Sequence, residues 1–554
     1  MADIAAPRSR IVRPSLLILS TVILLTLAFA PMGQFYLAWV GLAPWLVLVA
    51  ETRSLKAAFF WSWITGTLFF IANMWWMAVI SWPGMLALLS FCGLLWGPAA
   101  LIIRKAGLLQ TGMIRGILGI AVVWTAFEWV RGIIFTGLPW LFLGYTQTPI
   151  LPVCQIADIT GAYGVTFWVV AVNALVALAW LRRDRFNQSI PSVIILSIVT
   201  LLILVYGIFR IDQTGGVLSP GPTIAVVQSN YPQNNHGEKS ADVNERLDFS
   251  IRQTMAILNR LPGKIDMVVW SETMMEALNS TARAEVPDFQ GQYDTISALA
   301  RDNHVALLTG GVYYGDWKDE QHPDGEYLVP QDRRNTSYFF DQFGNEDDSP
   351  GHRYDKVHLV PWGEFIPGKD SLPFLYKLSI QLGPKYYSDY VMQPGNILTV
   401  FHLRNGGRDW RFVTPICFED IDARIVSAMF RPDADGNKRA DFIVNLTNDG
   451  WFKGSENADH VQAASFRSIE NRAWTARSVN TGISGFVDSV GHCSDLVPAR
   501  TVGAGVRQIM IDPRLTFYTR FGDCFAGLCN LSTLGIVAWA WSRKWFAGSR
   551  KEKS

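Results

Sequence analysis

Apolar residues gather in long runs at both ends of the chain, and this pattern predicts membrane-spanning helices. Each run is close to the roughly 20 residues that cross a hydrocarbon core, and polar residues fall between the runs. Because further apolar runs follow the first one, we interpret it as a transmembrane helix rather than a cleavable signal peptide. The eight predicted spans are residues 15–31, 34–51, 57–78, 82–103, 114–135, 159–181, 190–209 and 523–542.

Basic residues mark alternate connections between these spans and predict their orientation. They precede the first span, occupy every second connection and follow the last span, whereas the connections near 31–34 and 79–83 contain none. Since positively charged loops stay in the cytoplasm, both termini are predicted to be cytoplasmic and residues 211–522 to lie outside. The pattern comprises Arg8, Arg10, Arg13, Arg53, Lys56, Arg104, Lys105, Arg115, Arg182, Arg183, Arg185, Arg543, Lys544, Arg550, Lys551 and Lys553.

Residues 218–520 show a different pattern, in which short β-branched runs alternate with amphipathic segments. Such alternation predicts an α/β domain with a well-covered sheet. A stretch at 316–353, rich in Asp, Gly and Pro, is interpreted as an exposed excursion. The predicted strands are 223–228, 265–270, 305–312, 412–417 and 441–446, and the predicted helices include 242–261 and 459–476.

The chain is therefore predicted to combine a multi-pass α-helical membrane domain with an α/β domain. Seven transmembrane helices occupy residues 1–210, the extracytoplasmic domain 218–520, the eighth helix 523–542 and a cytoplasmic tail 543–554.

Composition supports the membrane class and excludes several functions. Hydrophobic residues make up 50% of the chain, charged residues only 17%, and there are 22 tryptophans, which favour membrane interfaces. A net charge of +1 without a basic stripe argues against nucleic-acid binding. Six scattered cysteines, with no CxxC or HExxH pattern, predict neither a disulfide scaffold nor a zinc site.

Two charged residues stand within the fifth predicted span. Glu128 and Arg131 are three positions apart, so helical geometry allows them to pair. The following segment, 136–147, is rich in Gly and aromatic residues and falls on the outer side. Two interpretations of this segment stay open: an aromatic anchor at the interface, or a surface that shapes the path of a lipid toward the external domain.

Three chemically active side chains fall at or just beyond predicted strand ends. Glu272 follows the strand 265–270, Lys356 begins a loop shaped by Gly and Pro, and Cys417 ends the strand 412–417. Strand ends are where α/β sheets form their sites. Taken singly, these residues are better explained as a structural cysteine and two solvated surface charges than as catalytic groups.

If the three side chains meet, their chemistry assigns the roles. Lys356 lowers the pKa of the thiol and stabilises an oxyanion. Glu272 takes the thiol proton, returns it to the leaving group and then activates the second nucleophile. Cys417 attacks an acyl carbon and holds the acyl group as a thioester.

These residues carry a resemblance to a known family. Trp270-Ser271-Glu272, Lys356 and Cys417-Phe418-Glu419 resemble the Glu-Lys-Cys triad of the carbon–nitrogen hydrolase (nitrilase) superfamily. With seven helices before this domain and one after it, the chain resembles the membrane branch of that superfamily, the apolipoprotein N-acyltransferases. Further motifs in the same order are FAP at 29–31, GLPW and GYTQ around Trp140, VQSNYPQ at 227–233, KVHLVPWGEFIP at 356–367, TNDGWF at 447–452, the segment 467–472 and NTG at 480–482.

The resemblance implies a fold, a reaction and a location. The fold is a four-layer αββα sandwich outside the inner membrane of a bacterium, on the periplasmic side. The reaction is a ping-pong transfer of a phospholipid acyl chain to Cys417, and then to the α-amino group of a diacylglyceryl-modified N-terminal cysteine on an apolipoprotein. Glu364 and Glu419 become supporting acidic residues that orient Lys356 and tune its charge. No metal and no organic cofactor are implied.

Four positions depart from the pattern of this family. Phe418 stands where Tyr is frequent, the run 234–237 lacks a Trp, Lys453 replaces Gly and Val479 replaces Thr. None of these positions belongs to the triad, so they bear on substrate preference more than on the chemistry.

Apolar residues near Lys356 suggest an entrance for acyl chains. An enzyme that joins bilayer acyl chains to an external acceptor needs a pocket open to the outer leaflet. Trp362, Phe365, Phe374 and Leu375 either line that entrance or belong to an ordinary core. The first interpretation predicts that the loop 362–390 is mobile and dips toward lipid.

Two other functions remain as alternatives. A membrane-anchored nitrilase-like amidase or hydrolase would use water as the acceptor, but it would need only one of the eight helices. A transporter with an external binding domain predicts polar residues along the spans, and few are found beyond Glu128 and Arg131.

Overall fold

The computed structural model describes residues 14–231, 242–322, 325–366, 373–382, 391–452 and 456–551. Several sequence predictions fall outside these residues: those on Arg8, Arg10, Arg13, Lys453, Lys553, the run 234–237 and the parts 367–372 and 383–390 of the loop 362–390.

The eight predicted membrane segments are all helical. Six helical stretches of the described chain are long and apolar enough to cross a membrane: 55–79, 82–105, 113–131, 162–181, 183–216 and 524–542. The first two predicted spans form shorter helices, 14–28 and 35–51, and a short apolar helical stretch at 151–160 was not predicted. The helices are α1 (Pro14–Ala28), α2 (Ala38–Gly41), α3 (Ala43–Glu51), α4 (Leu55–Met74), α5 (Trp82–Leu94), α6 (Trp96–Lys105), α7 (Met113–Arg131), α8 (Leu151–Cys154), α9 (Ala157–Thr160), α10 (Ala162–Leu181), α11 (Ile190–Asp212) and, after the α/β domain, α18 (Phe517–Phe521) and α19 (Cys524–Lys551).

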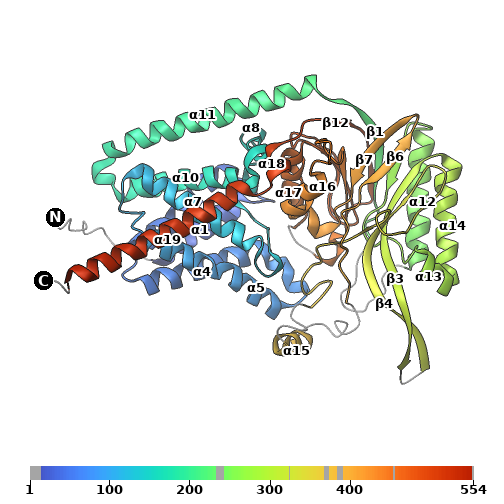
Figure 1. The fold of residues 1–554 in the computed structure, drawn as a ribbon, viewed down its shortest axis with the longest axis horizontal. Coiled ribbons are helices and arrows are strands. Elements are labelled where there is room, and N and C mark those ends of the chain that lie inside the picture. Colours follow the sequence, from blue (N-terminus) through green and yellow to red (C-terminus); the bar gives the residue numbers. More distant parts are fainter. Residues whose placement is uncertain are drawn as a thin grey trace.

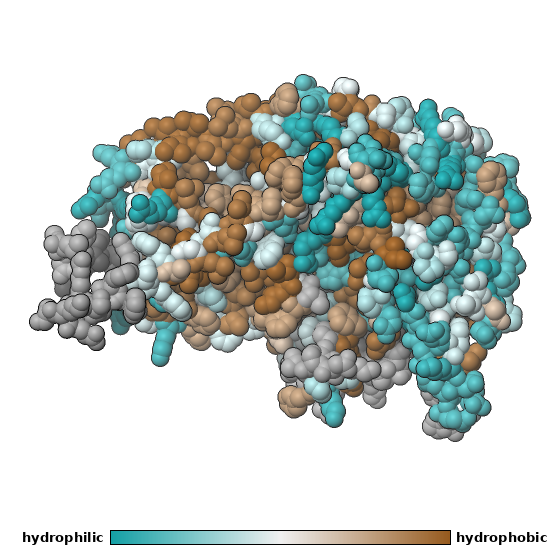
Figure 2. Space-filling model, viewed as in Figure 1, coloured by the Kyte–Doolittle hydropathy of each residue, from teal (hydrophilic) through white to brown (hydrophobic). Residues whose placement is uncertain are grey.

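The membrane helices expose apolar side chains, as lipid requires. Figure 2 shows hydrophobic surface concentrated over these helices and hydrophilic surface over the rest of the molecule. Inside the bundle, the rings of Trp45, Trp96 and Trp124 pack edge to face with centroids 4.7–5.5 Å apart. The indole N–H of Trp45 donates to Ser62 (2.9 Å), so this deeply buried polar group is satisfied.

The second domain is a four-layer αββα sandwich, as expected. One six-stranded sheet has the order β12-β1-β2-β3-β4-β5 and the other β11-β10-β9-β8-β7-β6. The central pairs are parallel, with Val226 opposite Val269 and Phe412 opposite Phe442. The strands are β1 (Ser219–Gln228), β2 (Met267–Val269), β3 (Ala306–His322), β4 (Gly325–Phe340), β5 (Tyr354–Asp355), β6 (Phe401–Asn405), β7 (Arg408–Val413), β8 (Phe442–Thr447), β9 (Trp474–Val479), β10 (Ser484–Val487), β11 (Cys493–Val497) and β12 (Gly503–Ile511).

The two sheets bury an apolar core between them, and helices cover their outer faces. Helices α12 (Val243–Arg260), α13 (Ser280–Glu285) and α14 (Pro287–Asn303) lie on the side away from the membrane domain (Figure 1). Helices α16 (Ala423–Phe430) and α17 (Glu456–Asn471) lie between the second sheet and the membrane helices (Figure 1). A further helix, α15 (Pro373–Leu382), lies apart from this core.

Two sequence predictions about this domain are wrong. The stretch 316–353 is not a plain excursion, because β3 and β4 continue through 322 and from 325 as a two-stranded antiparallel ribbon that extends beyond the sheet (Figure 1). Solvent covers both faces of the ribbon, so its strands carry no apolar alternation to reveal them. The predicted helix 459–476 ends at 471, since Arg472 takes a left-handed conformation (φ +46°) and β9 begins at 474.

At the end of α7, Glu128 and Arg131 both form hydrogen bonds with the connection 138–143 and do not form a direct ion pair with each other. Glu128 accepts hydrogen bonds from the backbone N–H of Leu143 (3.0 Å) and the hydroxyl of Thr166 (2.8 Å). Buried backbone groups of a connection need such partners, which explains the observed geometry. Arg131 donates to the carbonyl oxygens of Leu138 (2.8 Å), Trp140 and Leu141 (3.3 Å).

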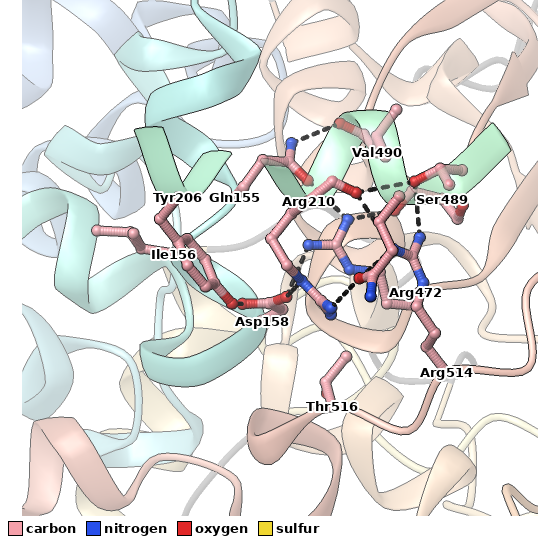
Figure 3. Close-up of polar contacts among 12 residues, drawn as sticks. Gln155, Ile156, Asp158, Tyr206, Arg210, Arg472, Ser489, Val490, Arg514 and Thr516 are labelled. Carbon is pink, nitrogen blue, oxygen red and sulfur yellow. Dashed lines mark hydrogen bonds and ion pairs between the residues drawn. The ribbon is translucent and has the colours of Figure 1, made fainter. Parts of the chain in front are cut away.

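A buried arginine joins the sandwich to the membrane domain (Figure 3). Arg472 donates from Nη2 to Asp158 (2.7 Å) and from Nη1 to Gln155 (2.6 Å), two residues of the short helical stretch that was not predicted. Asp158 also accepts hydrogen bonds from Tyr206 (2.7 Å) and Arg210 (2.8 Å) of α11. Since Asp158 and Arg472 are 2% and 0% exposed, one buried carboxylate neutralises two guanidinium groups from different domains.

The Asp158→Ala variant is expected to lose about 3–5 kcal/mol of stability, because it leaves Arg472 buried without a counter-ion. Denaturant unfolding of the purified protein in detergent measures this loss. Asp302→Ala is the matched control, since Asp302 is 65% exposed and pairs only with the exposed Arg301. An equal effect of both substitutions would contradict the proposed importance of the Asp158 contacts.

Candidate active site

Cys417 begins a tight helical turn, η8 (Cys417–Ile421), that follows β7. Pro415 has no N–H to continue the ladder, and Ile416 makes only an isolated bridge to Leu446 of β8. Cys417 itself has φ +50°, a left-handed conformation that is uncommon for a residue with a side chain. Such local strain is typical of functional positions, and here it presents the thiol at the strand end.

The side chains of Glu272, Lys356 and Glu364 lie together beside this turn. Lys356 Nζ is 3.6 Å from Glu272 Oε1 and 3.0 Å from the carboxylate of Glu364. Asn335 Nδ2 donates to both carboxylates, at 2.7 and 2.8 Å. The second oxygen of Glu272 accepts a hydrogen bond from the backbone N–H of Asn448 (2.7 Å). Each charged group is therefore held by specific partners.

The site is buried, and burial perturbs its ionisation. Glu272 is 4% and Lys356 1% exposed, so neither is a solvated surface charge. Burial raises the pKa of Glu272, an effect that the ammonium of Lys356 only partly offsets. Burial alone would lower the pKa of Lys356, but the carboxylates of Glu364 and Glu272 raise it overall. Lys356 therefore remains an ammonium ion at neutral pH.

Cys417 lies within hydrogen-bonding reach of Glu272 and is partly exposed. Burial of the thiol and the nearby Glu272 carboxylate raise the pKa of Cys417, while Lys356 lowers it. The resting site thus holds a neutral thiol, a carboxylate and an ammonium. This arrangement suits proton removal by Glu272 during attack, not a preformed thiolate.

Glu419 supports the site through the backbone rather than by touching Lys356. One of its oxygens accepts from the backbone N–H groups of Val357 (2.7 Å) and His358 (2.9 Å). The other accepts from the Ile416 N–H and the Tyr354 hydroxyl, both at 2.8 Å. A single buried carboxylate therefore fixes the segment after Lys356 to the residue before Cys417.

The structure thus brings together Glu272, Lys356, Cys417 and Glu364, with Glu419 directly behind them. Sequence reasoning missed Asn335, which lies within β4 in the stretch that was interpreted as an excursion. No local pattern marks it, because its role depends on where the neighbouring strands place the two glutamates. Phe418, one of the departures from the family pattern, packs edge to face on His358 with ring centroids 5.3 Å apart.

The membrane domain contacts this site through two tryptophans. Trp140 donates a hydrogen bond to Asp459 of α17 (3.3 Å), and its ring stands edge-on to His460 (4.6 Å between centroids). The ring of Trp76 packs against Phe452 (4.7 Å). A cleft beside Trp140 is lined by apolar residues of both domains, among them Phe29, Leu141, Ile421 and Ala463. Ile421 is the last residue of the turn that carries Cys417, so the cleft adjoins the candidate nucleophile.

Acylation of Cys417 is expected to slow as pH falls through a value above the ordinary glutamate pKa of about 4.3. Burial raises the pKa of Glu272, and its protonated form cannot take the thiol proton. Quenched mass spectrometry of the enzyme with a saturating acyl donor measures the rate at each pH. A rate that stays constant down to pH of about 4 would contradict Glu272 as the base.

Two family models and a set of curated proteins match the chain. Residues 22–175 match the apolipoprotein N-acyltransferase N-terminal domain, and residues 223–498 match carbon-nitrogen hydrolase. An apolipoprotein N-acyltransferase of Geobacter metallireducens is 29% identical over 546 residues, covering 94% of each chain. Another, of Chlorobaculum tepidum, is 26% identical over 521 residues, covering 91% of each.

Two solved structures each match about half of the chain. An amidase from Nesterenkonia sp. matches with 17% identity and a TM-score of 0.36, covering 56% of this chain and 98% of the amidase. A carbon-nitrogen hydrolase from Helicobacter pylori G27 matches with 14% identity and a TM-score of 0.33, covering 52% and 89%.

Proposed function

The chain belongs to the apolipoprotein N-acyltransferase family, and from this premise we propose that it moves an acyl chain from a phospholipid to a lipoprotein through a thioester on Cys417. The family assignment makes it an N-acyltransferase of lipoprotein biosynthesis with a nitrilase-like domain and a membrane body. The phospholipid donor, the covalent intermediate and the residue roles are the proposed part.

In the first half-reaction, the Cys417 sulfur attacks the ester carbonyl of the phospholipid. The thiol proton passes to Glu272, and the negative oxygen that forms is stabilised by the Lys356 ammonium. The C–O bond of the ester then breaks, Glu272 returns the proton to the departing oxygen, and a lysophospholipid leaves. The acyl group stays on sulfur as a thioester.

In the second half-reaction, the free α-amine of an S-diacylglyceryl cysteine attacks the thioester carbon. The N–C bond forms, the S–C bond breaks, and one amine proton returns to Cys417 through Glu272. Glu364 and Glu419 act as positioning residues for Lys356 and the Cys417 turn. The observation that carries this proposal is the buried contact of Lys356 with Glu272 and Glu364 beside a strained cysteine.

We also propose the topology: residues 218–520 lie on the periplasmic side of the inner membrane, and both termini lie in the cytoplasm. Contacts between segments predicted to share the cytoplasmic side support this orientation. Arg104 donates to the carbonyl oxygen of Val49 (3.1 Å), and Lys105 lies 4.6 Å above the ring of Trp541. Arg182 donates to the carbonyl oxygen of Thr111.

The space beside Trp140 is about the size of a water molecule, so it does not itself hold an acyl chain. Both interpretations of the segment 136–147 therefore stay open. Trp362 and Phe374 are 40% and 76% exposed, and these apolar side chains are therefore accessible to lipid. Contact between the loop 362–390 and lipid stays a prediction, which hydrogen exchange of the protein in bilayers would test.

The order of the two half-reactions provides the test. Purified enzyme incubated with phospholipid alone is expected to gain the mass of one acyl chain and to release one equivalent of lysophospholipid. Removal of the lipid, followed by a diacylglyceryl-cysteine peptide, should transfer that chain to the peptide amine. Release of free fatty acid before any peptide is added would favour the hydrolase alternative, and no covalent adduct at all would refute the proposal.

A further inference from the structure

A further buried carboxylate, Asp449, lies beside the triad, and one of its oxygens makes no hydrogen bond among the described residues. Strand β8 ends at Thr447, and the backbone N–H of the next residue, Asn448, binds Glu272. Asp449 is only 2% exposed, and within the described chain its Oδ2 makes no hydrogen bond. Its charge is close enough to raise the pKa of the Cys417 thiol, so the carboxylate belongs to the surroundings of the nucleophile.

Asn457 brings a second unpartnered oxygen to the same place. This residue lies in the first turn of α17, is 8% exposed, and its Oδ1 accepts no hydrogen bond from the residues that the structure describes. Both oxygens converge over Gly482: a Cβ added there would lie 2.1 Å from Asp449 Oδ2 and 2.7 Å from Asn457 Oδ1. Only glycine leaves room for this pair of acceptors.

The cationic side chains nearby, Arg477 and His460, approach a different carboxylate, although Arg477 Nε and Nη2 make no hydrogen bond among the described residues. Arg477 forms an ion pair with Asp420, and His460 Nδ1 lies 3.3 Å from the same carboxylate. Burial raises the pKa of Asp449, although His460 and Arg477 act against this shift. A buried charge of this kind is costly unless a cation binds it.

Two converging acceptors call for a ligand that donates. An ammonium group has three N–H donors and a positive charge, so it satisfies both oxygens and compensates the carboxylate. A divalent metal is a poorer match: the described residues contain no group of three or more His, Cys, Asp or Glu side chains placed to hold one. A trapped water would satisfy the hydrogen bonds but would leave the charge.

We propose that Asp449 and Asn457 form the subsite that binds the α-amino group of the acyl acceptor as its ammonium ion, which releases one proton to water before the free amine attacks the thioester. This inference rests on the proposed function, since it assigns the binding of the second substrate in that reaction. Asp449 and Asn457 have no role in the first half-reaction, because the reacting carbon of the donor ester carries no primary amine. Asp449 therefore acts on acceptor binding, while Glu272, Lys356 and Cys417 act on the acyl group.

The test separates the two half-reactions in the full-length Asp449→Asn variant. Thioester formation with phospholipid, followed by intact mass, is expected to proceed at or above the wild-type rate, because the Asp449 charge no longer raises the pKa of the Cys417 thiol. The KM for a diacylglyceryl-cysteine peptide is expected to rise at least about tenfold, because a charge-assisted hydrogen bond is lost. Release of the acyl group by hydroxylamine, a small neutral nucleophile, is expected to be unchanged. Asp409→Asn, on an exposed hairpin, is the control for loss of a carboxylate.

The outcomes are distinguishable from failure of the proposed function. If the wild type forms no thioester, the acyl-enzyme mechanism fails before the subsite is tested. If it does, an unchanged KM for the peptide in Asp449→Asn overturns the subsite. A parallel loss of thioester formation and of hydroxylamine release also overturns it, since Asp449 would then act by positioning Cys417. An Asn457→Leu variant with the same selective rise in KM would support the paired acceptors.

Discussion

Replacing Cys417 with serine is expected to abolish both thioester formation and transfer, with a loss of about 10⁴-fold or more in acyl-transfer rate. The hydroxyl of serine is a far weaker nucleophile than sulfur, and it is much less acidic than a thiol, so a carboxylate such as Glu272 removes its proton far less readily. Intact mass after incubation with phospholipid should show no added acyl chain. Lysophospholipid release, followed by thin-layer chromatography, should fall to the background rate.

The matched control is Cys493→Ser, because Cys493 is a partly exposed cysteine of the same domain that lies on β11, away from the triad. Its thiol contacts only Ser465 among the described hydrogen-bonding side chains (3.7 Å). This variant should acylate at the wild-type rate. Retained acylation in Cys417→Ser, or its loss in Cys493→Ser, would remove Cys417 from the mechanism. If Cys417→Ser still transported a substrate at the wild-type rate without becoming acylated, the transporter alternative would be favoured instead.

The Lys356→Met variant is expected to lose at least about 10³-fold in rate and about 3–5 kcal/mol of stability. Methionine keeps the length of the side chain but removes the charge that faces Glu272 and Glu364. Those two buried carboxylates would then share only Asn335 as a side-chain donor. A rate assay and denaturant unfolding in detergent measure the two losses.

The stability loss in Lys356→Met should depend on pH, and its sign follows from the carboxylates. Without the ammonium, burial and mutual repulsion raise the pKa of Glu272 further in the folded state, so folding favours the protonated form. The deficit relative to the wild type is therefore smallest at low pH. It grows as pH rises from the unfolded glutamate pKa of about 4.3 through the raised folded value.

The control for this prediction is Lys318→Met, on the exposed β3–β4 ribbon. It removes the same charge from a solvated position and should change neither rate nor stability by more than about 0.5 kcal/mol. A deficit in Lys356→Met that does not vary with pH would show that Glu272 and Glu364 are not the groups that Lys356 neutralises.

Most of the fold was accessible from the sequence because its patterns have simple physical causes. Long apolar runs mark the membrane helices, and short β-branched runs mark the buried strands, so the helical body and an α/β domain were both predicted, whereas the four-layer αββα arrangement was implied by the family resemblance. The boundaries were less accurate where packing overrides local preference. Cys417 begins a turn instead of ending a strand, and the helix after residue 456 stops at a left-handed Arg472 whose side chain is bound by the other domain.

The residues of the candidate site also differ in whether the sequence could reveal them. Glu272, Lys356 and Cys417 were singled out because each follows an apolar run or begins a shaped loop, and because their order resembles a known family. Asn335 and the free oxygen of Asp449 had no such signal. The importance of both depends on which groups lie within hydrogen-bonding distance, and residue spacing along the chain does not encode that distance.

By itself the sequence determined the class of the protein: local hydrophobicity decides which segments enter a bilayer or a sheet, and a set of motifs in fixed order identifies the family. Tertiary structure alone decided that two glutamates and an ammonium share one buried space beside the thiol, and that Glu128 and Arg131 bind a connection instead of each other. Desolvation and hydrogen bonding act over a few ångströms, yet the residues concerned are tens to hundreds of positions apart in the sequence. Only the register of the two sheets and the docking of the domains set the distances between them.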